Sequence, residues 1–155
     1  MLNYIRNDLI KLRDVTLDAA VDAHQIATHK ENVAENKYDT LGLEAAYLAH
    51  GQSQRVSEYN TAIAAYNRMS SINFDDSMPA TVGALIKLID DTDNMIWIFL
   101  GPSSGGVILD YEGLKITLVT PISPLGKALQ GSFVGDDINV ISAGTPKNYQ
   151  LAEIY

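Results

Sequence analysis

Apolar side chains recur at steps of three and four residues along the first part of the chain. The positions at this spacing are Leu2, Ile5, Leu9, Leu12, Thr16, Ala19, Ala23 and Ile26. Such an alternation is a heptad repeat, and it places one narrow apolar stripe along a helix. The pattern therefore predicts a long helix that packs through this stripe.

A second stripe follows after a polar segment at 28–37. It comprises Tyr38, Leu41, Ala45, Leu48, Gln52, Val56, Tyr59, Ile63 and Tyr66. Two successive steps of four meet at Gln52, and this stutter is expected to unwind a supercoil locally. The two stripes predict an antiparallel helical coiled-coil hairpin, with arms of about 30 residues that span roughly 45 Å each. In the alternative, helices that cover a globular core, the apolar faces would be broader.

The second half of the chain has a different pattern. Only two of the 11 glycines precede residue 80, and all five prolines lie at or after Pro79. Short β-favouring runs alternate there with turn signals. These runs are Val82–Ile89, Met95–Leu100, Val107–Leu109, Leu114–Val119, Ile138–Ile141 and Tyr149–Ile154. They predict a mainly antiparallel sheet.

One segment of this half favours a helix. Ser123 is a helix-capping residue, Pro124 suits the first helical position, and Gly131 suits the position after the end. The expected fold class is therefore α+β. We expect a coiled-coil hairpin over residues 1–72, a linker at 70–79, and a β-sheet domain with one short helix over residues 79–155.

The net charge of the chain disfavours one class of partner, nucleic acids. Lys and Arg number 11 against 19 Asp and Glu, which gives a formal net charge of −8. Affinity for nucleic-acid phosphates depends on clustered Lys and Arg, so nucleic acid is not the expected main partner. The chain has no Cys, which excludes disulfides and thiolate zinc sites. No basic leader or run of about 20 apolar residues is present, so we expect a cytoplasmic protein without a membrane.

The residue pattern indicates no self-contained enzyme active site. His24, His29 and His50 lack the spacing of a metal site. The glycine-rich segment 101–106 lacks the Lys-Ser/Thr ending of a phosphate loop, and its serines have no accompanying His pattern. We therefore expect neither an enzyme nor a cofactor bound by the isolated chain.

Three carboxylates stand out in the polar segment between the two stripes. Glu31, Glu35 and Asp39 are spaced by four residues, so they share one face if the segment is helical. Like charges at this spacing disfavour a helix slightly, which raises the question of a cation. A solvated polar loop is the alternative.

The end of the chain resembles a known family. Residues 116–131 have a strand followed by a Ser-Pro-x-x-x-x-Leu-x-Gly helix, residues 134–136 are Val-Gly-Asp, and residues 149–155 form an acidic-apolar closing strand that ends in Tyr. These motifs, behind a long hairpin, resemble the bacterial Gre-type (GreA/GreB) transcription elongation and transcript cleavage factors. The resemblance implies an FKBP-like fold for residues 79–155.

The hairpin tip departs from the family pattern, which has an Asp and then a Glu three residues later. Placing Glu35 on the family's Glu puts Asn32 at the Asp position. An ungapped alignment of the second helix puts Glu35 at the Asp position and Tyr38 at the Glu position instead. Either alignment replaces one of the two usual carboxylates, and Glu31 and Asp39 stand close by.

The resemblance implies a cofactor of RNA polymerase that stimulates the polymerase's own cleavage of backtracked RNA. The hairpin would enter the secondary channel, where Glu35, with Asp39 or Glu31, would assist Mg²⁺ shared with the polymerase active site. Ser123, Pro124 and Lys127 match the family helix near which the polymerase is expected to dock; capping and solubility are the alternative roles. The nascent RNA 3′ end would be contacted indirectly, and DNA only weakly within the transcription complex.

Two other functions stay open. The same architecture suits a regulator that occupies the polymerase channel without stimulating cleavage. The FKBP-like domain also suggests a peptidyl-prolyl isomerase, although a fold does not determine a function.

Overall fold

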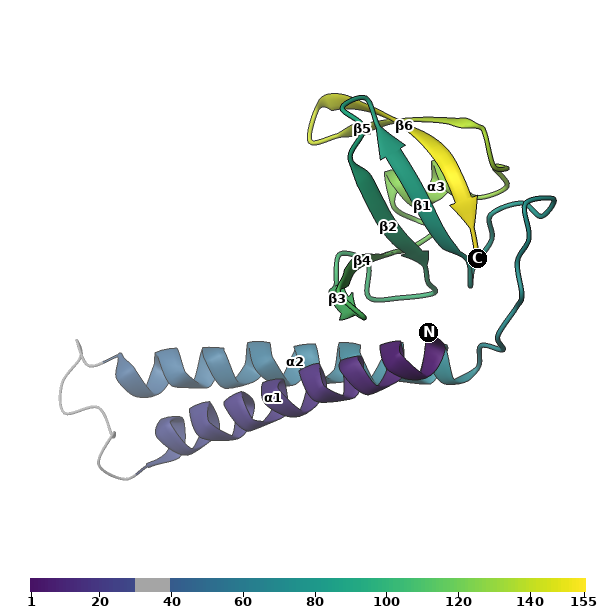
Figure 1. The fold of residues 1–155 in the computed structure, drawn as a ribbon. Coiled ribbons are helices and arrows are strands. Elements are labelled where there is room, and N and C mark those ends of the chain that lie inside the picture. Colours follow the sequence, from purple (N-terminus) through teal and green to yellow (C-terminus); the bar gives the residue numbers. More distant parts are fainter. Residues whose placement is uncertain (30–39) are drawn as a thin grey trace. The chain divides into compact units, whose positions relative to one another are not determined.

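The computed structural model describes residues 1–29 and 40–155. Its first two elements are the helices α1 (Leu2–Thr28) and α2 (Leu41–Asn67), of 27 residues each. Each helix is therefore about 40 Å long. The two helices lie side by side and run in opposite directions (Figure 1), which confirms the predicted helical hairpin.

The stripe of low exposure on α1 differs from the predicted one. Buried and half-buried positions run through Ile5, Leu9, Leu12, Thr16, Ala20, Ala23 and Ala27. The predicted Ala19 and Ile26 are exposed, Ile26 by 45%. Two successive steps of four meet at Thr16, so the stripe repeats every 11 residues, from Ile5 through Thr16 to Ala27. An 11-residue repeat follows a nearly straight helix better than a heptad does.

The stripe on α2 is also shifted. It runs through Ala45, Ala49, Gln52, Val56, Tyr59, Ile63 and Tyr66, with steps that alternate between four and three. The predicted Leu41 and Leu48 are exposed by 53% and 56%. The stutter predicted at Gln52 is therefore wrong, because Ala49 rather than Leu48 occupies the buried position. The predicted Tyr38 lies outside the described residues.

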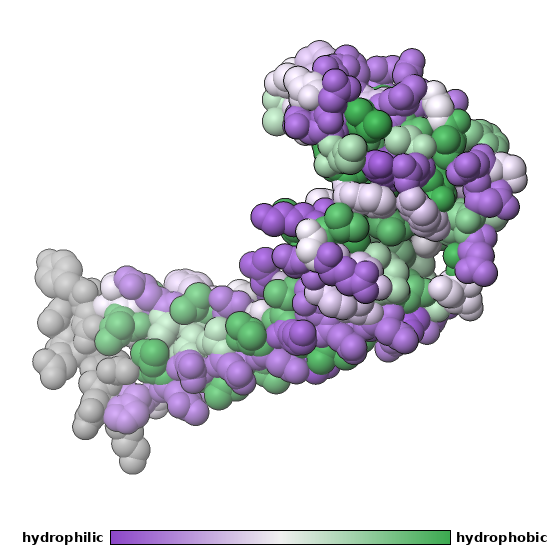
Figure 2. Space-filling model, in the orientation of Figure 1, coloured by the Kyte–Doolittle hydropathy of each residue, from purple (hydrophilic) through white to green (hydrophobic). Residues whose placement is uncertain are grey.

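Small side chains fill the buried stripe in the half of the hairpin towards residues 29 and 40. The buried residues there are Ala20, Ala23, Ala45 and Ala49. Large apolar side chains are left exposed on the same stretch, namely Val15, Leu17, Val21, Ile26, Leu41, Leu43, Tyr47 and Leu48. Figure 2 shows hydrophobic atoms at the surface of the hairpin among hydrophilic ones. The hairpin thus exposes more apolar surface than its own packing requires.

Six strands form one mixed sheet, in the order β3-β4-β2-β1-β6-β5. The strands are β1 (Leu85–Asp90), β2 (Met95–Leu100), β3 (Ile108–Tyr111), β4 (Leu114–Val119), β5 (Asp137–Ser142) and β6 (Thr145–Ile154). The pairing of β2 with β4 is parallel, and the other four pairings are antiparallel. The mainly antiparallel sheet predicted from the alternating runs is confirmed.

One face of the sheet packs against the short helix α3 (Pro124–Leu129). The buried core on this face includes Ile86 and Leu88 of β1, Ile98 of β2, Leu151 of β6, and Leu129 of α3. Phe74, in the predicted linker, packs against this core. The segment between α2 and β1 is therefore partly anchored to the sheet, although it contains no helix or strand.

The opposite face of the sheet is partly covered by tyrosines. The Tyr66 ring centroid lies 6.4 Å from that of Phe99, and the Tyr66 hydroxyl donates to the Ser103 carbonyl oxygen at 3.0 Å. The Tyr4 ring meets Tyr111 edge-on, with the centroids 5.0 Å apart. The two ends of the hairpin sequence therefore pack with the sheet.

Packing divides the chain into two compact units. One unit comprises Ile5–Ala64, and the other comprises Met1–Tyr4 together with Ala65–Tyr155. The domain limits at 1–72 and 79–155 remain a prediction. No helix in the described parts of the chain has the combination of length and hydropathy needed to cross a membrane.

Candidate functional site

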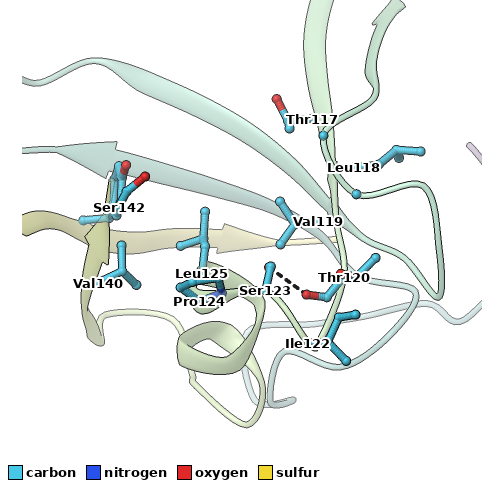
Figure 3. A pocket seen from close by; sticks show the side chains of 13 residues that line it. Thr117, Leu118, Val119, Thr120, Ile122, Ser123, Pro124, Leu125, Val140 and Ser142 are labelled. Atoms are coloured by element: carbon cyan, nitrogen blue, oxygen red, sulfur yellow. Dashed lines mark hydrogen bonds between the residues drawn. The ribbon is translucent and has the colours of Figure 1, made fainter. Parts of the chain in front are cut away.

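A hollow of about 500 Å³ lies in the sheet unit beside α3. Its lining comes from α3 with the turn before it, from β4 and the turn at 105–106, and from β5 and β6 (Figure 3). β5 ends the sheet on one side, and β4 is next to the last strand on the other. The hollow is thus formed by strands far apart in the sheet order, brought together around α3.

The sequence before α3 fixes the helix next to the end of β4. The Ser123 hydroxyl accepts a hydrogen bond from the Gly126 backbone N–H at 3.0 Å and donates one to the Thr120 carbonyl oxygen at 2.8 Å. Pro124 occupies the first turn, where a missing N–H costs nothing. Gly131 follows the end with a φ of 87°. The predicted helix and its capping residues are confirmed.

Gly126 makes this close packing feasible. A Cβ atom at this position would lie 1.9 Å from the Thr120 carbonyl oxygen, far inside van der Waals contact. Only glycine therefore allows α3 to approach the backbone of the preceding turn so closely. This approach brings Pro124 and Leu125 to the wall of the hollow.

The predicted partner-binding residues are divided between the hollow and the nearby surface. Ser123 and Pro124 line the hollow, but the Ser123 hydroxyl is engaged in capping. Lys127 is exposed on α3 and does not line the hollow. The structure confirms that Ser123 caps the helix, and polymerase contact by these residues remains a prediction.

Several lining residues were missed by the sequence reasoning. Ile122, between Pro121 and Ser123, is 81% exposed, and Val140 and Tyr149 contribute from β5 and β6. An apolar residue inside a Pro-x-Ser-Pro turn was a usable signal for Ile122. Val140 and Tyr149 carried no such signal, because only the pairing of distant strands brings them to α3.

The chemistry of the hollow favours binding over catalysis. Its lining contains no Asp, Glu, Lys, Arg or His, and its polar groups are hydroxyls and backbone. The Lys87–Glu153 ion pair at 2.8 Å, whose hydrogen bond lowers the pKa of Glu153, involves neither a lining residue nor α3. The hollow therefore fits an apolar group of another molecule.

The three predicted tip carboxylates, Glu31, Glu35 and Asp39, lie outside the described residues. Within residues 1–29 and 40–155, no group of three or more His, Asp or Glu side chains is arranged to hold a metal ion. The assistance of Mg²⁺ by the tip thus remains a prediction.

Comparison with known proteins identifies a relative over nearly the whole chain. The sequence is 24% identical over 151 residues to the transcription elongation factor GreA of Syntrophus aciditrophicus (strain SB), covering 97% of this chain and 88% of that protein. The chain is a relative of the Gre-type factors. No protein-family model matches this chain.

Two solved structures are similar to this chain over most of its length. One is GreA factor homolog 1 (Gfh1) of Thermus thermophilus, with 16% identity, coverage of 97% of this chain and 94% of that one, and a TM-score of 0.38. A second structure of the transcription factor Gfh1 has 20% identity, coverage of 97% and 92%, and a TM-score of 0.43.

Proposed function

We propose that this Gre-type chain is a transcription elongation factor that binds RNA polymerase and stimulates the polymerase's own cleavage of backtracked RNA. The observation that carries the proposal is the match to a GreA protein over 97% of the chain, which spans both the hairpin and the sheet unit. In this function the chain is an accessory factor and not itself an enzyme. It acts in the cytoplasm, with the nascent RNA 3′ end approached only inside the polymerase.

The surface of the hairpin supports a protein partner. The helical stretches 14–28 and 41–54 carry four carboxylates, Asp14, Asp18, Asp22 and Glu44, and no Lys or Arg. Exposed apolar side chains lie on the same stretches, including Leu17 and Tyr47. Clustered apolar exposure is typical of protein interfaces, and the absence of cations disfavours phosphate binding. We propose that these flanks enter the secondary channel of the polymerase.

In this proposal the sheet unit supplies the docking contact. The apolar hollow beside α3 offers a place for a side chain of the polymerase, with Pro124 on its wall and Lys127 on the adjacent surface. Ser123 contributes by capping α3 and holding Pro124 at the wall. We propose that Ser123, Pro124 and Lys127 contribute to partner binding in this way.

The chemistry proposed for the tip is help to a metal ion of the polymerase. Hydrolysis of a phosphodiester with two Mg²⁺ ions stabilises the attacking and the leaving oxygen. Mg²⁺ binds through one or two carboxylates and keeps several waters, so a single placed carboxylate suffices to help retain an ion. Glu35, with Asp39 or Glu31, is proposed for this role.

A transcript-cleavage assay on backtracked RNA polymerase tests the tip. Glu35→Ala is expected to reduce the stimulation of cleavage by roughly tenfold or more, as loss of a metal ligand or its orienting partner does. Asp39→Ala and Glu31→Ala show which of the two neighbouring carboxylates assists Glu35. Glu58→Ala, at an exposed carboxylate on α2 outside the two stretches named above, is the matched control and should keep full activity. Full stimulation by all three tip variants would refute the role of the tip.

Polymerase pull-down separates docking from capping. Ser123→Asn retains a capping side chain and should bind normally, whereas Ser123→Ala should lose about 1 kcal/mol of stability. Pro124→Ala and Lys127→Gln leave the cap in place, so weaker polymerase binding by either indicates a direct contact. Wild-type binding by both variants would count against docking at α3.

A second candidate is a channel-occupying regulator without cleavage activity. It is favoured by the tip sequence, in which one of the two usual family carboxylates is replaced in either alignment. Cleavage and initiation assays with the same protein discriminate the two functions. Inhibited initiation without any cleavage would support the regulator.

A further inference from the structure

Within residues 1–29 and 40–155, no strand pairs with the outer edge of β5. Ser142 pairs with Thr145 across the two-residue turn Ala143–Gly144, whose φ angles of 50° and 80° belong to a tight hairpin turn. In such a ladder alternate residues bond to the neighbouring strand, so residues 138, 140 and 142 bond to β6. The backbone N–H and C=O of Asn139 and Ile141 therefore point away from the sheet.

This edge has little of the usual protection against pairing. Exposed edges are normally shortened, or carry charged side chains, especially Lys, or Pro. β5 has six residues with neither Lys nor Pro; its one charge is Asp137 at the first position, and Ile141 is 68% exposed. The other edge strand, β3, has only four residues. An open and apolar edge in a folded protein indicates a surface that accepts another strand.

The two faces beside this edge differ in character. Val140 and Ser142 line the apolar hollow next to α3. Asp137 and Asn139, which point to the opposite face by strand alternation, line a second hollow together with Asp90, Asp91 and Asp93. Lys147 of β6 lines a hollow adjacent to Asp90 and Asp91 and offsets part of this charge. The edge thus joins an apolar face to an acidic face.

We propose that β5 binds an extended peptide segment of a partner protein by strand addition. The peptide's backbone would pair with Asn139 and Ile141, about 4.8 Å from β5. Its side chains alternate between the faces, so apolar residues enter the hollow beside Leu125 and Val140, while Lys or Arg residues face Asp137 and its neighbours. The segment recognised is therefore extended, with alternating apolar and basic residues.

This inference shares the hollow beside α3 with the docking contact proposed above, but it rests on the edge of β5 and is measured on the isolated chain. Binding of a peptide to the isolated chain can succeed or fail whatever the chain does to RNA polymerase. The two proposals are therefore tested by separate measurements.

Titration of the full chain with synthetic peptides of about six residues, a typical strand length, tests the proposal. The probe alternates valine and lysine; controls alternate valine with glutamate, or carry N-methyl groups on alternate residues, which block one backbone edge. The valine–lysine peptide should bind and should perturb the NMR amide signals of Asn139 and Ile141. Its affinity should fall when salt is added. Both controls should bind roughly tenfold more weakly or not at all.

Proline variants identify the edge. Asn139→Pro removes an outward N–H and leaves the β6 ladder intact, so binding should fall roughly tenfold with the fold retained. Ile108→Pro, at an outward position on the β3 edge, is the matched control and should bind normally. Asp137→Asn should weaken binding of the valine–lysine peptide by roughly threefold and leave binding of the other peptides unchanged.

Three results would overturn the proposal. They are absence of binding by the valine–lysine peptide, equal binding by the N-methylated peptide, and equal binding by Asn139→Pro. A dimer in sedimentation experiments that Asn139→Pro dissociates would assign the edge to a second copy of this chain, and would also overturn it.

Discussion

At the scale of single residues, the turn after β1 fixes the charge of an exposed carboxylate. The Asp90 side chain accepts hydrogen bonds from the Thr92 hydroxyl at 2.7 Å, the Thr92 backbone N–H at 2.9 Å and the Asn94 backbone N–H at 3.0 Å. These hydrogen bonds lower the pKa of Asp90 to about 2, and the bond from the Thr92 hydroxyl has the largest effect. The turn thus depends on the ionised form.

We predict that the turn contributes to acid sensitivity. Because the pKa of Asp90 is lower in the folded chain, its contribution to stability is present above the ordinary value of 3.8 and is lost as pH falls towards about 2. Urea unfolding over this pH range should show a shallower decline for Asp90→Asn than for the wild type. Equal slopes for the two proteins would contradict the prediction.

Two glycines offer opposite predictions for the same substitution. Gly126→Ala places a Cβ atom 1.9 Å from the Thr120 carbonyl oxygen, so it should destabilise the sheet unit by about 3 kcal/mol or more. Gly51→Ala in α2 meets nothing within 4 Å and should stabilise the hairpin by about 0.5–1 kcal/mol. Chemical denaturation with probes in each unit measures both effects. An Ala tolerated at position 126 would mean that α3 shifts easily.

At the scale of elements, α2 shows that size alone does not decide which apolar residue is buried. Leu48 and Ala49 are both compatible with the helical period, yet Ala49 is buried and Leu48 is exposed. We predict that Leu48→Ala changes stability by less than about 0.5 kcal/mol. Ala49→Leu should destabilise the hairpin by about 1–3 kcal/mol through overpacking. The helical circular-dichroism signal during thermal unfolding measures both effects. A larger loss of stability for Leu48→Ala would indicate that Leu48 is packed, as the predicted stripe requires.

The elements themselves were largely predictable from the sequence. Both long helices, the six strands and the capped helix α3 agree with their local signals, because periodicity and turn residues act over a few positions. The stripe on each helix was predicted wrongly in part, since Ala19 and Ala20, or Leu48 and Ala49, satisfy the same period. The hollow was not predicted, because Leu125 and Val140 meet only through the pairing of distant strands.

At the scale of the whole molecule, Tyr66, near the end of α2, packs within the sheet unit. Its ring is fully buried, and burial raises the pKa of its hydroxyl, which stays protonated and donates to Ser103. A Cβ atom on Gly101 would lie 2.1 Å from this hydroxyl oxygen. The glycine and the tyrosine therefore form one coupled contact.

A double-mutant cycle tests this coupling. Tyr66→Phe should cost about 1 kcal/mol through the lost hydrogen bond, and Gly101→Ala about 1–3 kcal/mol through the clash. The double variant should be more stable by about 1 kcal/mol than the sum of the two single-variant effects predicts, because the oxygen that clashes with the alanine is absent. Equilibrium urea unfolding supplies all three values, and simple additivity would show that Tyr66 moves aside without cost.

The order of the strands also determines when the sheet can be completed during synthesis. β6 lies between β1 and β5, and Leu151 pairs with Leu88, so β5 joins the sheet only through a strand translated after all the other described strands. The helices of the hairpin emerge first and need no such distant pairing. A ribosome-bound nascent chain ending before residue 145 should therefore contain formed helices and an incomplete sheet, a state accessible to chaperones and proteases until β6 pairs.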